Sequence, residues 1–196
     1  MLDGVFTKTY PAPTVDRREI LRYAGCKEAI ESVERMLDEC LTECENALVY
    51  RVCYRVLTAE DFYRIFGENT RLDGCAYAVI FAATLGLDID RLIARYRNVS
   101  VTKSVLLQAI GTERIEGLCE AFCEDIKAQA LAKGYCTRTR FSAGYGEFPL
   151  EKQKEFFTLL DCARKIGLTL TDGLLMSPTK SVTAAVGLYA LGTDEE

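Results

Sequence analysis

Residues 75–84 read Cys75-Ala-Tyr-Ala-Val-Ile-Phe-Ala-Ala-Thr84, an unbroken apolar run bounded by Gly74 and Gly86. Its length and its content of β-branched and aromatic residues favour a strand that is buried on both faces, although periodicity alone also allows a buried helix. We therefore predict that this run forms a central strand of a sheet.

The segments on either side of this run supply further strands. Residues 47–57 alternate, with Leu48, Tyr50, Val52, Tyr54 and Val56 on one face and Arg51 and Arg55 on the other. This pattern predicts a half-buried strand. Towards the C-terminal end, strands are predicted at 168–171, 174–176 and 181–190, and a short one is expected to end near Arg140. Asp172-Gly173 and Pro178 provide the turns between the last three.

Helical spacing accounts for most of the remaining sequence. Helices are predicted at 16–23, 26–45, 58–67, 89–97, 102–133 and 150–166, the fifth with a possible bend at Gly111. Asp16 and Thr58 are suited to the N-cap positions, and Gly67, Gly134 and Gly167 to the C-terminal ends. Because no repeat or linker interrupts this order, we expect residues 1–196 to form a single α+β domain, with an antiparallel or mixed sheet and flanking helices.

Length, charge and hydropathy narrow the class of protein. The 196 residues suffice for one well-buried core. The net charge of −5, with no concentrated basic run, argues against a nucleic-acid partner. No apolar run is long enough to cross a bilayer, and the first ten residues lack the features of a secretion signal. We therefore expect a cytoplasmic protein with no membrane partner.

The chain has nine cysteines and no histidine. Cys40 with Cys44 and Cys119 with Cys123 are each four residues apart, so each pair could share a helix face and in principle hold a metal. However, the sequence has no Cys-x-x-Cys motif and no histidine to complete a mixed zinc site. We therefore expect reduced, structural thiols and no metal. The absence of histidine also excludes serine or cysteine nucleophiles that depend on an imidazole of this chain.

The most distinctive motif is Arg140-Phe-Ser-Ala-Gly144-Tyr145-Gly-Glu-Phe-Pro149, an Arg-x-x-x-Gly-Tyr-x-x-x-Pro loop. The guanidinium of Arg140 matches a carboxylate with two parallel hydrogen bonds. Gly144, like Gly146, allows positive φ and a close approach of a ligand to the main chain. Tyr145 could stack on a purine or face a sulfonium cation. Pro149 fixes the exit into the next helix.

Taken singly, each of these residues has a more common structural interpretation: a surface ion pair, a turn, a packing tyrosine, a helix-start proline. The combination is less common. Four fixed positions at this spacing arise by chance in roughly one chain per thousand of this length. The loop is therefore a candidate site for a small zwitterionic ligand that also carries a positive centre.

The loop and the segments around it resemble the activation domain of cobalamin-dependent methionine synthase. Arg140, Gly144, Tyr145 and Pro149 stand at the fixed positions of that family's motif. Residues 118–122, 166–172 and 176–182 (Leu-Cys-Glu-Ala-Phe, Ile-Gly-Leu-Thr-Leu-Thr-Asp and Met-Ser-Pro-Thr-Lys-Ser-Val) resemble further family blocks. The resemblance is strongest over 113–187 and is closest to the short, free-standing members. Those members often have a proline where this chain has Ala143.

The resemblance implies an S-adenosylmethionine-binding module that acts in trans, with no catalytic residue of its own. Its cobalamin would be carried by a partner, either a methionine synthase core or another corrinoid protein. Inactive cob(II)alamin would be restored by a methyl group from S-adenosylmethionine and one electron from a flavodoxin-like donor. The resemblance also implies the site residues: Arg140 for the ligand carboxylate, the Ser142–Gly144 backbone (including Ala143) along the ligand, and the Tyr145 ring against it. Pro149 belongs to the same site, and the partner of the ligand ammonium is left open.

Two other functions remain compatible with the sequence. One is an S-adenosylmethionine-dependent methyltransferase that acts on a small molecule, although the Gly-rich fingerprint of Rossmann-type methyltransferases is absent. The other is an interaction module of the same fold that binds no ligand.

Overall fold

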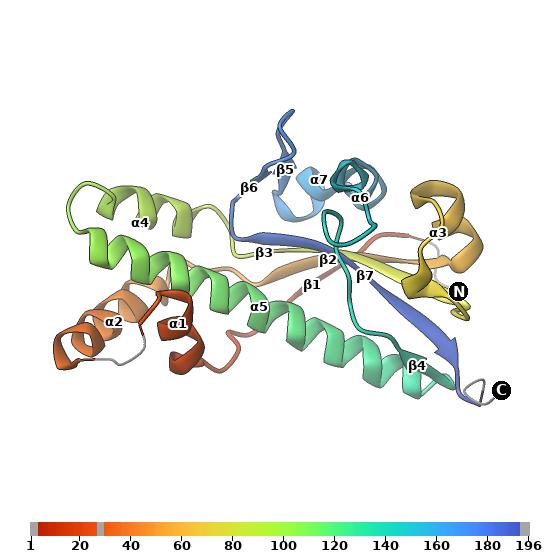
Figure 1. The fold of residues 1–196 in the computed structure, drawn as a ribbon, viewed down its shortest axis with the longest axis horizontal. Coiled ribbons are helices and arrows are strands. Elements are labelled where there is room, and N and C mark those ends of the chain that lie inside the picture. The colour runs from red at the N-terminus through yellow and green to blue at the C-terminus, as the bar shows by residue number, and fades with distance from the viewer. Residues whose placement is uncertain (1–3, 27–29, 193–196) are drawn as a thin grey trace.

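The computed structural model describes residues 4–26 and 30–192, and a five-stranded sheet lies at its centre (Figure 1). Every neighbouring pair of strands is antiparallel, and the order is β1-β2-β3-β7-β4. The strands are Phe6–Thr9 (β1), Arg51–Thr58 (β2), Tyr77–Thr84 (β3), Ser181–Ala190 (β7) and Tyr135–Thr137 (β4). The predicted α+β class is therefore confirmed. The apolar run at 75–84 supplies the middle strand, β3.

Helices cover both faces of this sheet, as Figure 1 shows. One face carries α1 (Arg17–Tyr23), α2 (Glu31–Cys44), α4 (Asp88–Tyr96) and α5 (Val101–Leu131). The other face carries α3 (Ala59–Phe66), α6 (Gln153–Leu160) and α7 (Cys162–Ile166). Each face has its own cluster of buried apolar side chains, so the sheet separates two hydrophobic cores.

Strand β3 shows why its sequence is uniformly apolar. Val79, Phe81 and Ala83 belong to the core on the α5 face. The residues that alternate with them, Ala78, Ile80 and Ala82, belong to the core on the α6 face. Because successive side chains of a strand point to opposite faces, a strand with a core on each side has no solvated position.

The long helix α5 follows its prediction closely and continues through Gly111 without a break. Ser100 caps its start by accepting a hydrogen bond from the Lys103 amide. At Gly111 the aliphatic chain of Lys180 packs directly on the helix: an added Cβ would lie 2.8 Å from its Cε. Gly111 therefore permits a close approach between α5 and the start of β7. No helix in the described ranges is long and apolar enough to span a bilayer.

The N-terminal segment is held against α5 by a buried ion pair. Glu113 and Arg114 are neighbours on α5, both are almost fully buried, and they contact each other. The Arg114 guanidinium donates to the carbonyl oxygens of Pro13 and Thr14, and Glu113 accepts from the amide of Asp16. Asp16 in turn caps α1, as predicted. Strand β1, which precedes this segment, has no counterpart in the sequence predictions.

Several predicted boundaries need correction. The helix expected at 26–45 is α2, which begins at Glu31, and residues 27–29 of that prediction lie outside the described ranges. The strand expected at 47–57 is β2, which begins at Arg51. The strands expected at 168–171 and 174–176 are a separate short hairpin, formed by β5 (Thr169–Leu170) and β6 (Met176–Ser177).

The prediction of one helix over 150–166 was wrong. The segment is a 3-10 turn, η2 (Leu150–Lys152), followed by α6 and α7, which meet at Asp161 with φ of 49°. Leu160 and Cys162 are both fully buried. On a continuous helix two residues two positions apart do not share a face. The left-handed turn at Asp161 lets both side chains enter the core, and Asp tolerates that conformation better than most residues.

Candidate functional site

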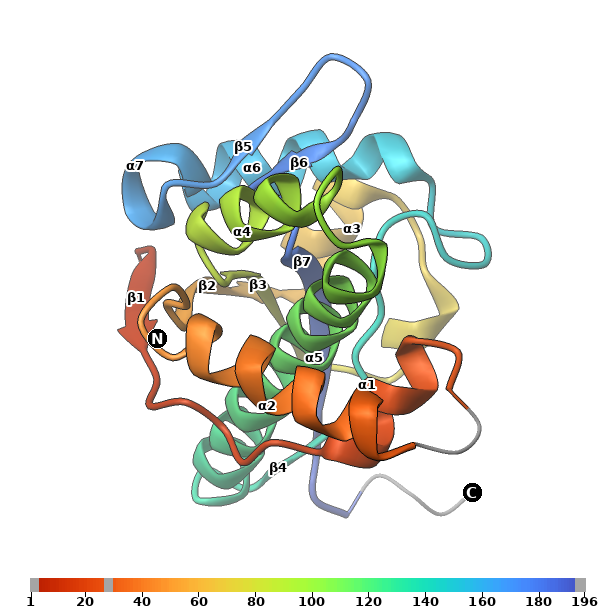
Figure 2. The same ribbon diagram turned by 90° about the vertical axis from the view of Figure 1, so that its left-hand side faces the viewer.

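The site is organised by the loop of residues 138–149, which runs from β4 to η2 and protrudes beside α6 (Figure 2). Phe141 joins it to β7, where its amide donates to the Ala185 carbonyl (3.0 Å) and its carbonyl accepts from the Ala185 amide (2.8 Å). The chain then turns back, and the Gly144 amide donates to the Phe148 carbonyl (2.8 Å). Gly144 and Gly146 both have positive φ, of 92° and 60°. The turn therefore uses the conformational freedom of both glycines.

Aromatic packing fixes both ends of this turn in the core on the α6 face. Phe141 and Phe148 are buried, with ring centroids 5.6 Å apart. Each also packs against Phe62 of α3, at 6.1 and 6.2 Å. By contrast, Tyr145 at the tip of the turn is 75% exposed. The loop is therefore anchored in the core at both ends of its turn and exposes the Tyr145 ring at its tip.

A cavity of about 500 Å³, which we call the Arg140 cavity, lies along the loop. The loop contributes residues 139–143 and Tyr145 to the lining. The rest of the lining comes from the 3-10 turn η1 (Thr70–Leu72), through Arg71, and from α5 (Glu116), α6 (Gln153), β6 (Met176) and β7 (181–183). The side chain of Arg140 is 25% exposed and its guanidinium pairs with the Glu116 carboxylate. The cavity therefore contains both a cation and an anion.

Two further polar groups of the Arg140 cavity are buried without a partner. Gln153 and Thr183 are only 6% and 2% exposed. In the described part of the chain, the Gln153 Oε1 and Thr183 Oγ1 atoms have no hydrogen-bond partner. Buried polar groups are nearly always hydrogen-bonded, because an unsatisfied group costs about 1–3 kcal/mol. Two such groups in one cavity indicate a place where a bound molecule would complete the hydrogen bonding.

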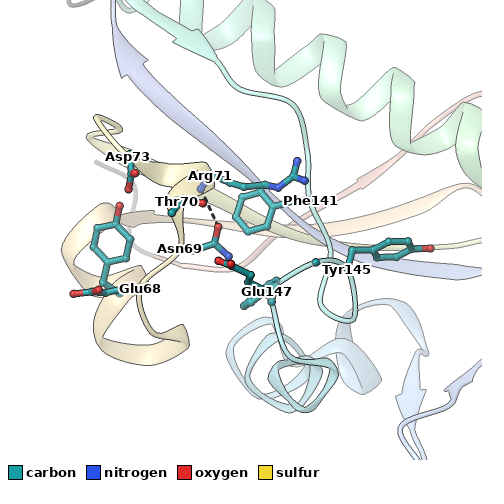
Figure 3. A pocket seen from close by; sticks show the side chains of 11 residues that line it. Glu68, Asn69, Thr70, Arg71, Asp73, Phe141, Tyr145 and Glu147 are labelled. Atoms are coloured by element: carbon teal, nitrogen blue, oxygen red, sulfur yellow. Dashed lines mark hydrogen bonds between the residues drawn. The ribbon is translucent and has the colours of Figure 1, made fainter.

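A second and larger cavity, which we call the Glu147 cavity, lies on the other side of the loop (Figure 3). It measures about 850 Å³ and is lined by three carboxylates, those of Glu68, Asp73 and Glu147. The aromatic rings of Tyr63, Phe141, Tyr145 and Phe148 complete much of its wall. Its carboxylates belong to exposed residues. This cavity is therefore acidic, lined by aromatic rings and solvent-exposed at its carboxylates.

Arg71 lines both cavities, together with Phe141 and Tyr145. Its side chain reaches from η1 towards the Phe141 ring (Figure 3). Within the described part of the chain, no carboxylate forms an ion pair with the Arg71 guanidinium. Arg71 is thus a second cation at the site, and one with unused hydrogen-bonding capacity.

The predicted site residues divide into two groups. Arg140, Ser142, Ala143 and Tyr145 line the Arg140 cavity. Gly144 and Pro149 lie outside both linings and shape the loop instead. An added Cβ on Gly144 would lie 3.0 Å from the Leu150 Cδ1 atom. Pro149 has φ of −62° and directly precedes η2.

Arg71, Glu116, Gln153 and Thr183 are among the lining residues that were not predicted. They come from η1, α5, α6 and β7, and only the tertiary fold brings them together. One of them left a signal in the sequence. Thr183 directly precedes the apolar stretch Ala184-Ala185-Val186 in the buried middle of β7, where a hydroxyl is unusual.

Cys119 and Cys123 of α5 lie close enough to Arg140 to interact with it electrostatically. Burial raises the pKa of the Cys123 thiol to about 11 and raises the pKa of Cys119 further. Both side chains are therefore neutral thiols at physiological pH. Among the described residues, no three His, Cys, Asp or Glu side chains gather into a possible metal site.

Comparison with known proteins identified a matching family and similar solved structures. Residues 57–191 match a protein family described as the activation domain of vitamin B12-dependent methionine synthase. This range includes the 113–187 stretch of the sequence resemblance and extends upstream of it. A solved structure of the MetH reactivation domain bound to AdoHcy superimposes with a TM-score of 0.67 at 15% sequence identity. The alignment covers 98% of this chain and 80% of that chain. No curated protein sequence matches this one.

Proposed function

The chain belongs to the family of vitamin B12-dependent methionine synthase activation domains, and from this premise we propose that it binds S-adenosylmethionine in the Arg140 cavity. Its role would be to present the methyl group for reductive reactivation of a cobalamin that a partner protein carries. The observation that carries this proposal is the cavity itself. It combines a half-buried cation, a carboxylate, unpaired buried polar groups and the glycine-containing loop.

The cavity suits the amino-acid end of such a ligand. A volume of about 500 Å³ is within the usual range for small-molecule sites. Arginine has five N–H donors, of which the contact with Glu116 uses only one nitrogen, so Arg140 retains donors for a ligand carboxylate. Arg71, which pairs with no carboxylate of the described residues, would be a second cation for the same group. These two residues would set the position of the carboxylate.

The rest of the ligand would extend along the loop. The backbone of residues 142–144 would line it, as the family resemblance implies, and the exposed ring of Tyr145 would contact it. Tyr145 borders both cavities, so the sulfonium and adenosyl groups would lie near the acidic side. A positive sulfonium is favoured both by an aromatic face and by nearby carboxylates.

The metal chemistry would belong to the partner. A cobalamin supplies the cobalt that accepts the methyl group, and this chain, which has no histidine, contributes no imidazole to it. Its own residues would bind and orient the methyl donor. We propose a methionine synthase core or another corrinoid protein as the partner, with a flavodoxin-like protein as the electron donor. We further propose that residues 1–196 act as one domain, since β7 pairs with β3 from the middle of the chain.

Isothermal titration calorimetry of the purified protein with S-adenosylmethionine and with AdoHcy tests the first step. We expect one site per chain for each compound. Absence of heat with both would contradict the proposal and favour a ligand-free interaction module. The second step is tested with a cobalamin-loaded methionine synthase that lacks its own activation module, supplied with reduced flavodoxin. Addition of the protein should restore turnover, whereas methyl transfer to a small molecule without any corrinoid would indicate a methyltransferase instead.

A further inference from the structure

The unpaired atoms of Gln153 and Thr183 are the part of the Arg140 cavity that the proposed function leaves without a role. They come from the start of α6 and from β7, which are far apart in the sequence. Both side chains are more than nine-tenths buried, and both line the same cavity. Neither atom has a hydrogen-bond partner among residues 4–26 and 30–192. A ligand that enters this cavity would therefore meet two polar atoms whose hydrogen-bonding capacity is unused.

The chemistry of these atoms defines the group they would bind. The amide Oε1 of Gln153 only accepts hydrogen bonds, and the Thr183 hydroxyl both accepts and donates. Glu116 adds a carboxylate, one oxygen of which is engaged by Arg140. Three acceptors from three elements thus border the cavity. A primary ammonium group carries three N–H donors, so it matches this set in number and in charge.

The cations of the cavity complete the pattern. Arg140 and Arg71 both border it and would bind a carboxylate. A molecule with an ammonium and a carboxylate on one carbon, an α-amino acid, presents both groups together. Neither an amine without a carboxylate nor a carboxylate without an amine would use both sets of side chains.

We propose that Gln153 and Thr183, with Glu116, form the subsite for the α-ammonium of an amino-acid ligand, and that they make the cavity selective for that group. The inference rests on the proposed function, because it takes S-adenosylmethionine as the ligand whose amino-acid end enters. Gln153 and Thr183 are specificity-determining residues in this assignment. Their hydrogen bonds are made only in the complex.

The test uses two probes that differ only at this group: AdoHcy and an AdoHcy analogue that lacks the α-amino group. The first variants, Gln153→Met and Thr183→Val, keep the side-chain volume and remove the acceptor. Gln153→Glu and Thr183→Ser keep an acceptor in place. Matched controls are Gln129→Met on an exposed part of α5 and Thr158→Val on α6, whose hydroxyl bonds to the Lys154 carbonyl. Affinities are measured by calorimetry, and folding is checked by thermal unfolding.

The expected result is a loss of selectivity. Gln153→Met and Thr183→Val should each weaken AdoHcy binding about tenfold, the effect of leaving one ligand donor unpaired. The same variants should bind the deaminated analogue as tightly as the unsubstituted protein does. Gln153→Glu and Thr183→Ser should retain the preference for AdoHcy, and the two controls should leave both affinities unchanged.

Other results would overturn the inference. Equal weakening of both probes would mean that the two side chains only shape the cavity or hold a buried water. Unchanged affinity for AdoHcy in both variants would mean that the ammonium binds elsewhere. Either result leaves the proposed function intact, because the unsubstituted protein still binds AdoHcy. If the unsubstituted protein binds neither AdoHcy nor S-adenosylmethionine, the proposed function itself fails and the subsite fails with it. Because Thr183→Val removes an unsatisfied hydroxyl, the melting temperature of this variant should not fall below that of the unsubstituted protein.

Discussion

The two cavities on either side of the 138–149 loop share Arg71, Phe141 and Tyr145, yet they differ in what surrounds those residues. The Arg140 cavity has few charges, but Arg140 itself is half-buried, and the buried Gln153 Oε1 and Thr183 Oγ1 atoms lack partners among the described residues. The larger Glu147 cavity has more charges, all on exposed residues. Buried groups are worth more, because water does not compete for their hydrogen bonds. We therefore expect the smaller cavity to recognise the ligand. The larger cavity is expected to have only a modest electrostatic effect on ligand affinity.

The largest expected effect comes from the cation of the smaller cavity. Arg140→Ala should weaken binding of AdoHcy and S-adenosylmethionine about 100-fold, roughly 2.7 kcal/mol, because it removes the carboxylate contact and leaves Glu116 unpaired. The control is Arg164→Ala, an exposed arginine on α7 paired with Asp161, which should change nothing. Calorimetry distinguishes the two. A loss of less than threefold for Arg140→Ala would place the recognition site elsewhere.

A second test uses the turn that separates the cavities. Gly144→Ala forces a positive φ on an alanine and brings its Cβ to 3.0 Å from Leu150. Gly146→Ala has the same backbone requirement, but its added Cβ would have no non-neighbouring atom of the described residues within 4 Å. The left-handed conformation costs an alanine about 1–2 kcal/mol. Both variants should therefore lower the melting temperature, but only Gly144→Ala should also reduce AdoHcy affinity, by about tenfold. Equal losses of affinity would show that the contact with Leu150 does not position the loop.

The third test asks whether the acidic cavity distinguishes the two ligands. S-adenosylmethionine carries a positive sulfonium and AdoHcy does not. Glu147→Gln should weaken S-adenosylmethionine binding about threefold and leave AdoHcy unchanged, since an exposed charge pair contributes about 0.2–1 kcal/mol. The matched control is Glu151→Gln on η2, outside both cavities. The effect should disappear at 1 M salt. An equal change for both ligands would remove any role of the acidic cavity in sensing the sulfonium.

The smallest expected effect concerns the thiols beside Arg140 and depends on pH. Burial raises the pKa of Cys123 to about 11, above its unfolded value of about 8.5. A thiol whose folded pKa is raised stabilises the fold fully below the unfolded pKa, and that contribution is lost as pH rises towards the folded value. The free energy of unfolding in urea should therefore be flat from pH 7 to 8 and fall above about 8.5. Cys123→Ala should make this alkaline fall shallower, and an identical slope would contradict the assignment.

Local pattern was enough to predict much of the fold. The apolar run at 75–84, the caps at Asp16 and Thr58 and the spacing of α5 each predict an element that the structure contains. The break at Asp161 was not predictable, because the residues on both sides have helical spacing. Only the need to bury both Leu160 and Cys162 explains it. Strand β1 was not predictable either, because three of its four residues are exposed and show no strand pattern. It is defined by its pairing with β2.

The site was predictable only where it is contiguous. The Arg140 loop is a motif of ten residues, so its sequence alone makes it a candidate ligand site. Arg71, Glu116, Gln153 and Thr183 are single polar residues in four distant segments. Their positions relative to the loop follow from β7 pairing with β3 and from α5 packing on the sheet. Such convergence is a property of the tertiary fold, and a single sequence does not display it.

The burial of Cys119 and Cys123 determines whether the proposed methyl donor could alkylate the protein that binds it. A sulfonium methyl group is an alkylating agent, and a thiolate near it would be a competing acceptor. Because burial keeps both side chains protonated, neither is nucleophilic at neutral pH. A methyl donor held beside Arg140 would therefore not modify the protein that holds it. The activated methyl group would remain intact until a partner brings its own acceptor.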